Sequence, residues 1–151
     1  MSKTVSLSME ICQHNGDDVQ VSQVVRALLE AGWRMEINGQ VRYLPVGPED
    51  EGDYVYEERT VPELLDILDA KQRLGEFIGL SLFWGDTLVG GTLFVSALNR
   101  RLYDFDLSSD RRYLDQNNRL LDFNWYIGKV VPCLMEKFNV FRYTMDVSFC
   151  G

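Results

Sequence analysis

The sequence predicts an α+β protein, with a largely antiparallel sheet of about six or seven strands and three helices packed mainly on one face. Several segments alternate between apolar and polar residues, which is the pattern of a strand with one buried face. Three other segments carry apolar residues at helical spacing. Turn residues join the strand patterns in close succession, as in antiparallel hairpins, and together these features predict helices layered on an antiparallel sheet.

The first third of the chain contains a strand, a helix and a hairpin. Residues 4–12 alternate between polar and apolar side chains and predict the first strand. The turn residues at 15–18 are expected to supply the N-cap of a helix, whose apolar stripe runs from Val21 to Leu29. Alternation resumes over 33–44, where Asn38-Gly39 is the dipeptide that most strongly favours a two-residue hairpin turn.

An acidic loop and a second helix follow. Pro and Gly residues make 45–53 an expected exposed loop, and residues 54–57 are interpreted as a short edge strand. Thr60-Val61-Pro62-Glu63 has the pattern of a capping box with proline in the first turn, so a helix is expected to begin there and to end at Gly75.

Strand patterns dominate the next part of the chain. Residues 78–84 alternate, and 87–98 are expected to form the return strand. Within this return strand, Gly90-Gly91 predicts a bulge or a close backbone approach. A third strand is expected over 103–107, where the acids Asp104 and Asp106 are interpreted as ordinary surface residues.

The C-terminal part contains the third helix and the last strand. Residues 108–119 are polar and irregular, and Asp122 is expected to cap a helix whose stripe extends to Phe138. Pro132 lies inside this stripe and is expected to kink the helix or to shift its start. Residues 141–149 alternate as a closing strand. No repeat is visible, so residues 1–151 are expected to form one domain.

The charge of the chain bears on its partners. It has 151 residues, 23 acids and 15 bases, and a formal net charge of −8. Nucleic acids and anionic membrane surfaces are disfavoured partners, because binding to both depends on basic residues. The apolar runs are too short to span a bilayer, and no signal peptide is recognised, so a cytoplasmic location is expected.

The distribution of charge is more informative than its sum. Residues 47–69 contain nine acids and only Arg59 as a base, whereas the rest of the chain has fourteen of each. The whole net charge therefore lies in this window. Acids near the start of a helix and bases near its end have an ordinary helix-dipole explanation, but the loop acids do not.

No pattern of catalytic or metal-ligating residues is present. His14 is the only histidine and is expected to be a solvated turn residue. Cys12, Cys133 and Cys150 lack C-x-x-C spacing, which predicts neither a zinc site nor a disulfide framework. We therefore expect no enzymatic activity, no metal and no cofactor.

Tyrosines are interleaved with the loop acids, and this combination predicts a surface that binds a basic protein. Tyrosine provides contact area, and carboxylates provide electrostatic steering and pairing with Arg and Lys. The competing interpretation is a solvated acidic loop that only aids solubility. The predicted partner-binding residues are Glu49, Asp50, Glu51, Asp53, Tyr54, Tyr56, Glu57, Glu58, Asp66 and Asp69.

In composition and architecture the chain resembles the immunity proteins that neutralise secreted bacterial toxin domains. The resemblance covers the whole chain but includes no family-specific motif, so no residue role is carried over. It implies a cytoplasmic inhibitor that binds one basic toxin domain as a heterodimer; the oligomeric state of the chain itself stays open.

Three other functions compete with this one. A small-molecule-binding or regulatory domain would use an aromatic-lined pocket. An acidic DNA mimic would block a nucleic-acid-binding protein, and an enzyme would use a carboxylate site. A neighbouring toxin gene would favour the inhibitor, and a metabolic operon the small-molecule domain. The aromatic residues considered for the pocket are Trp33, Trp84, Trp125 and Tyr126.

Overall fold

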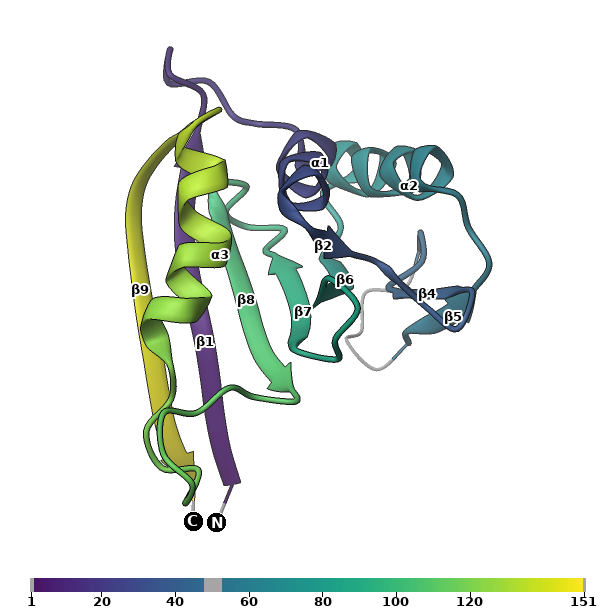
Figure 1. Ribbon diagram of the computed structural model, residues 1–151. Helices are drawn as coiled ribbons and strands as arrows, with labels where there is room; N and C mark the ends of the chain where they lie inside the picture. Colours follow the sequence, from purple (N-terminus) through teal and green to yellow (C-terminus); the bar gives the residue numbers. More distant parts are fainter. Residues whose placement is uncertain (1, 48–52, 151) are drawn as a thin grey trace.

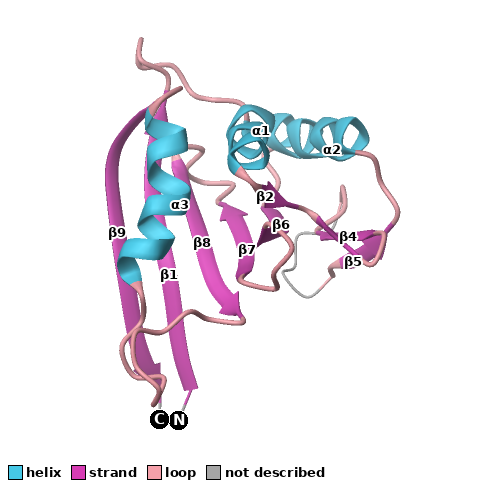
Figure 2. Cartoon of the chain, viewed as in Figure 1, coloured by secondary structure: helices cyan, strands magenta, loops and turns pink. Residues whose placement is uncertain are grey.

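The computed structural model describes residues 2–47 and 53–150 and confirms the α+β class (Figure 1, Figure 2). Within these residues there are three helices and nine strands, and the paired strands run antiparallel. The helices are α1 (Val21–Ala31), α2 (Val61–Leu74) and α3 (Phe123–Met135). The strands are β1 (Ser2–Cys12), β2 (Trp33–Arg34), β3 (Glu36–Ile37), β4 (Gln40–Tyr43), β5 (Val55–Glu57), β6 (Ile78–Trp84), β7 (Gly90–Val95), β8 (Leu102–Ser109) and β9 (Asn139–Cys150).

The strands form one sheet with the main order β3-β4-β6-β7-β8-β1-β9. β5 pairs with β4 on the side opposite β3 and β6, so β5 lies at one outer edge of the sheet. β9 lies at the other outer edge, next to β1, which places both chain ends side by side (Figure 1). The two edges of the sheet are therefore formed by segments far apart in the sequence.

The segment 33–44 divides into three short strands because its parts have different neighbours. Trp33 lies opposite Trp84 of β6, whereas β3 pairs with β4. The predicted hairpin turn is present: Asn38 and Gly39 have φ values of 53° and 79°. Positive φ at both central residues is what a type I′ turn requires.

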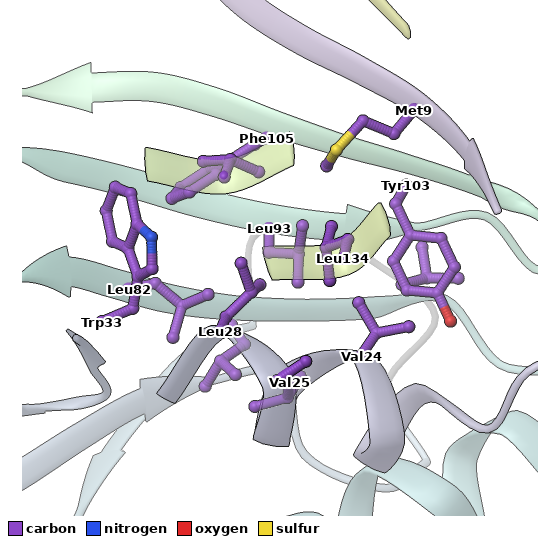
Figure 3. Close-up of a cluster of buried hydrophobic side chains, with 14 of the residues drawn as sticks. Met9, Val24, Val25, Leu28, Trp33, Leu82, Leu93, Tyr103, Phe105 and Leu134 are labelled. Atoms are coloured by element: carbon purple, nitrogen blue, oxygen red, sulfur yellow. The ribbon is translucent and has the colours of Figure 1, made fainter. Parts of the chain in front are cut away.

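Alternation along the strands separates a helix-covered face of the sheet from an open face. Buried residues of all three helices belong to the same apolar cluster as those of the sheet. In β1, Val5, Leu7 and Met9 are buried in this cluster, while Ser6 and Ser8 point to the open face and are half-buried. Figure 3 shows the contact between α1 and the sheet through Val24, Val25, Leu28, Met9, Leu93 and Phe105.

The start of α1 differs from the prediction. The turn at 15–18 was expected to cap this helix, but α1 begins only at Val21. The N–H of Val21 donates to Gln72 Oε1 at 3.0 Å, and that of Ser22 donates to Asp69 Oδ1 at 3.0 Å. Side chains of α2 thus satisfy the first N–H groups of α1, which a local sequence pattern does not encode.

The starts of α2 and α3 agree with the prediction. At α2, Glu63 N donates to Thr60 Oγ1 at 3.3 Å, and Thr60 N donates to Glu63 Oε1 at 3.2 Å, which is the predicted capping box. At α3, Trp125 N donates to Asp122 Oδ1 at 3.2 Å. Pro132 does not shift the start of α3, and the helix continues through it.

The return strand is shorter than predicted. Residues 87–98 were expected to be extended, but β7 starts at Gly90 and ends at Val95. Thr87 N donates to Trp84 O at 3.0 Å, and Val89 N donates to Thr87 Oγ1 at 3.1 Å. These hydrogen bonds close the turn between β6 and β7, so residues 87–89 do not extend β7.

Candidate protein-binding surface

Three of the predicted partner-binding residues lie together and exposed around β5. Tyr56 belongs to β5 and is 64% exposed, and Asp53 and Glu58 flank the strand and are also exposed. We call Asp53, Tyr56 and Glu58 the acidic edge. Since β5 is an outer strand of the sheet, a partner protein can reach these side chains without any rearrangement of the core.

A hollow of about 380 Å³ adjoins Tyr56. Exposed or half-buried apolar side chains form part of its wall, including Leu88, which is 53% exposed. An apolar hollow beside an exposed tyrosine can accept one side chain of a partner. The lining residues are Met35, Ile37, Asn38, Gln40, Arg42, Tyr56, Phe83, Leu88 and Ser109.

Arg42 forms a fixed cationic part of this hollow. Its Nη1 donates to Ser81 Oγ at 3.0 Å and to Thr92 Oγ1 at 3.2 Å, both on the open face. The guanidinium carbon lies 3.9 Å from the centroid of the Tyr54 ring. The predicted binding residue Tyr54 is therefore half-buried and packs within the protein.

Glu57 also makes contacts within the protein. Tyr43 Oη donates to Glu57 Oε2 at 2.7 Å, and Arg59 Nη2 donates to the same oxygen at 2.8 Å. The hydrogen bond from Tyr43, and then that from Arg59, lowers the pKa of Glu57. Its charge is thus partly compensated locally, and it contributes less to an external field than Asp53 and Glu58 do.

The other predicted residues lie away from β5 or outside the described ranges. Asp66 is exposed on α2, and Asp69 is half-buried and caps α1 through the N–H of Ser22. Glu49, Asp50 and Glu51 lie outside the residues that the structure describes. The structure therefore gathers Asp53, Tyr56 and Glu58 and assigns intramolecular contacts to Tyr54, Glu57 and Asp69.

The open face carries two further carboxylates, on β8. Asp104 accepts a hydrogen bond from Ser8 Oγ of β1. Burial raises the pKa of Asp106, and the nearby Arg111 opposes that rise. Asp104 and Asp106 occupy the polar positions of an alternating strand pattern, so the sequence predicts that both lie on the open face. The sequence does not show that β8 pairs with β1, and this pairing creates the surroundings of the two carboxylates.

The aromatic residues considered for a small-molecule pocket pack on one another. The Trp33 ring lies edge-on to Trp84 and Trp125, with centroid distances of 5.4 and 6.5 Å. Trp125 in turn lies 5.1 Å from Tyr126, and Trp33 Nε1 donates to Lys129 O at 3.0 Å. Trp33 also borders a hollow of about 370 Å³ beside the start of α2. Packing explains these four rings without a ligand.

Further comparisons add no family assignment. No protein family model, curated protein or solved structure matches the chain. In the described part of the chain, no group of three or more His, Cys, Asp or Glu side chains is placed to hold a metal ion. His14 is exposed in the loop after β1. No helix among the described residues is long and apolar enough to cross a membrane.

Proposed function

We propose that this protein is an acidic inhibitor that binds a basic protein domain through the acidic edge, and that the partner is a toxin domain which it neutralises. The concentration of the entire net charge of −8 in residues 47–69 carries the proposal. A localised negative field attracts a basic partner over several ångströms, and it raises the association rate more than the final affinity.

The environment of Tyr56 supports a contact at the same place. Aromatic side chains beside a pocket supply much of the binding energy in protein interfaces, while surrounding charges orient the partner. Tyr56 has this position, because its ring is largely exposed and borders the 380 Å³ hollow. Arg42, held by two hydroxyl groups, gives the hollow a defined shape before the partner binds.

The inhibitory role follows from the chemistry of the partner. A toxin that cleaves nucleic acid needs a basic surface for phosphates, and an acidic protein seated on that surface excludes the substrate. The resemblance to immunity proteins supports this role through composition and architecture. The small-molecule alternative has less support, because the aromatic rings considered for it contact one another.

The first test is capture of the partner by the immobilised 151-residue chain from an extract of its source cells. Two variants are compared with wild type. The acidic-edge variant, Asp53→Asn/Tyr56→Ala/Glu58→Gln, removes the acidic edge. The control variant, Asp17→Asn/Glu136→Gln, removes two exposed acids elsewhere on the protein. We expect wild type and the control to retain one basic protein and the acidic-edge variant to lose it. Truncating Tyr56 alone is expected to cost about 1–3 kcal/mol of binding free energy.

The second test concerns inhibition. The captured protein is expressed in a host alone, with wild type, and with the acidic-edge variant. The proposal expects growth arrest by the partner alone, relief by wild type and no relief by the variant. An acidic partner, or a partner retained equally by all three proteins, contradicts binding through the acidic edge. A basic partner that is harmless to the host contradicts the toxin assignment and leaves the binding surface intact.

A further inference from the structure

The outer edge of β9 is long and pairs with no other strand in the described part of the chain. Within the described residues, β1 is the only strand that pairs with β9, over Ser2–Cys12. Exposed edges are usually short or carry lysine, proline or inward-pointing charges that prevent association. β9 has twelve residues without lysine or proline, and Phe141, Tyr143 and Phe149 are 49%, 45% and 59% exposed. Figure 1 shows β9 at the margin of the sheet beside β1.

The directions of the backbone groups on this edge follow from the hydrogen bonds of β1. Ile11 N donates to Arg101 O, at the start of β8, at 2.8 Å. The backbone groups of successive residues in a strand point to opposite sides, so the even-numbered residues of β1 face β9. Ser8 lies opposite Thr144, which therefore turns its backbone toward β1. Tyr143 and Met145 consequently present their N–H and C=O groups to the free edge.

Two charges on the open face of β9 lie symmetrically about Thr144. Arg142 is two residues before Thr144 and Asp146 is two residues after it, and both are exposed. Among the described residues, the one ion pair of Arg142 is a long contact to Glu10, at 3.9 Å, and its side chain is 71% exposed. The bulge between β1 and β9 falls at Phe141, so Arg142–Asp146 belongs to the regular part of the strand.

We propose that β9 pairs antiparallel with β9 of a second copy of this chain, about a two-fold axis at Thr144. In this register Arg142 of each copy lies opposite Asp146 of the other copy, which gives two such pairs. Both pairs lie on the open face of one sheet that runs through both copies. Tyr143 lies opposite Met145 and exchanges backbone hydrogen bonds with it. The Arg142 and Asp146 positions form non-hydrogen-bonded pairs, in which facing side chains come closest.

Neighbouring registers lack this complementarity. The odd-numbered residues of β9 present their backbone groups to the free edge, so odd-numbered residues of the two copies must lie opposite one another. The two-fold axis therefore lies level with a residue, and neighbouring registers move it by one residue at a time. An axis at Met145 places Arg142 opposite Ser148, and an axis at Asp146 places the two Asp146 carboxylates in opposition. Charge complementarity therefore selects Thr144. Because β5 lies at the opposite edge of the sheet, this dimer leaves both acidic edges free, and the inference stands independently of the proposed function.

Sedimentation velocity of the full chain, over about a hundredfold range of protein concentration, tests the dimer by mass action. Wild type is expected to convert to a species of twice 17.4 kDa. Arg142→Asp and Asp146→Arg each create two like-charged contacts and are expected to weaken dimerisation at least about tenfold. The combined Arg142→Asp/Asp146→Arg variant restores opposite pairs and is expected to recover the affinity. Tyr143→Pro removes an N–H from the free edge only and is expected to be a folded monomer by circular dichroism.

A cross-linking experiment tests the register, in a Cys150→Ser background. Thr144→Cys places two thiols at a Cα separation of about 4.5 Å, which a disulfide can bridge. Ser148→Cys is the control, because its two copies would lie about 26 Å apart. We expect oxidation to link Thr144→Cys and not Ser148→Cys. A wild type that stays monomeric, a dimer indifferent to the charge reversals, or equal cross-linking of the two variants overturns the proposal.

Discussion

The guanidinium of Arg42 stacks on the ring of Tyr54, with the guanidinium carbon 3.9 Å from the ring centroid. This pair joins β4 to the residue just before β5 on the open face. The Tyr54 ring also lies close over the backbone of Gly79, where an added Cβ would be 2.0 Å from the tyrosine oxygen. The position of the acidic edge thus depends on two side chains that are themselves only partly accessible.

Arg42→Lys tests this bracing. Lysine keeps the charge but loses the planar stacking surface and the paired donation to Ser81 and Thr92. We expect the free energy of unfolding to fall by about 1 kcal/mol. Urea denaturation of both proteins measures this change, and an unchanged midpoint would show that the stacking does not hold β5 in place.

A pair of glycine substitutions tests the close approach of β7 and β8. A Cβ atom added at Gly91 would lie 1.8 Å from the backbone oxygen of Asp106. A Cβ atom added at Gly128 in α3 would have no neighbouring atom within 4 Å. Gly91→Ala is expected to destabilise the protein by about 3 kcal/mol or more, since backbone must move. Gly128→Ala is expected to stabilise it by up to about 1 kcal/mol through helix propensity. Thermal unfolding distinguishes the two, and a tolerated Gly91→Ala would contradict the observed register.

Local signals account for the parts of the fold that the sequence predicted well. The Thr60–Glu63 capping box and the Asn38-Gly39 turn are each encoded within four residues. The partners of the first N–H groups of α1 were missed because Gln72 and Asp69 belong to another helix. The same distinction applies to the binding surface: composition identified the acidic segment, but only the fold shows that Tyr54 packs against Arg42 and is half-buried whereas Tyr56 is exposed.

Asp106→Asn tests the pH dependence of stability. Burial raises the pKa of Asp106 in the folded state, so its contribution to stability is fully present below the unfolded carboxyl pKa of about 3.9. That contribution is lost as pH rises through the raised folded pKa. We therefore expect the variant to gain stability relative to wild type as pH increases from that acidic range toward neutrality. Denaturation at a series of pH values measures the difference, and a constant difference would contradict the raised pKa.

His14→Ala tests the absence of a catalytic role for this residue. His14 is exposed in a loop, so its removal is expected to change the free energy of unfolding by less than about 0.5 kcal/mol. Partner capture and relief of growth arrest should also persist. Loss of relief in a variant that folds normally and still binds would instead support the enzyme hypothesis.

The rate of association with the captured partner, measured as ionic strength increases, tests the acidic edge most directly. The Debye length falls from about 10 Å at 0.1 M salt to about 3 Å at 1 M, so the wild-type rate should fall steeply. Asp53→Asn/Glu58→Gln should associate more slowly at low salt and show a shallower dependence, while Asp17→Asn/Glu136→Gln should retain more of the wild-type slope. A wild-type rate independent of salt, or identical slopes for the two variants, would contradict steering by Asp53 and Glu58.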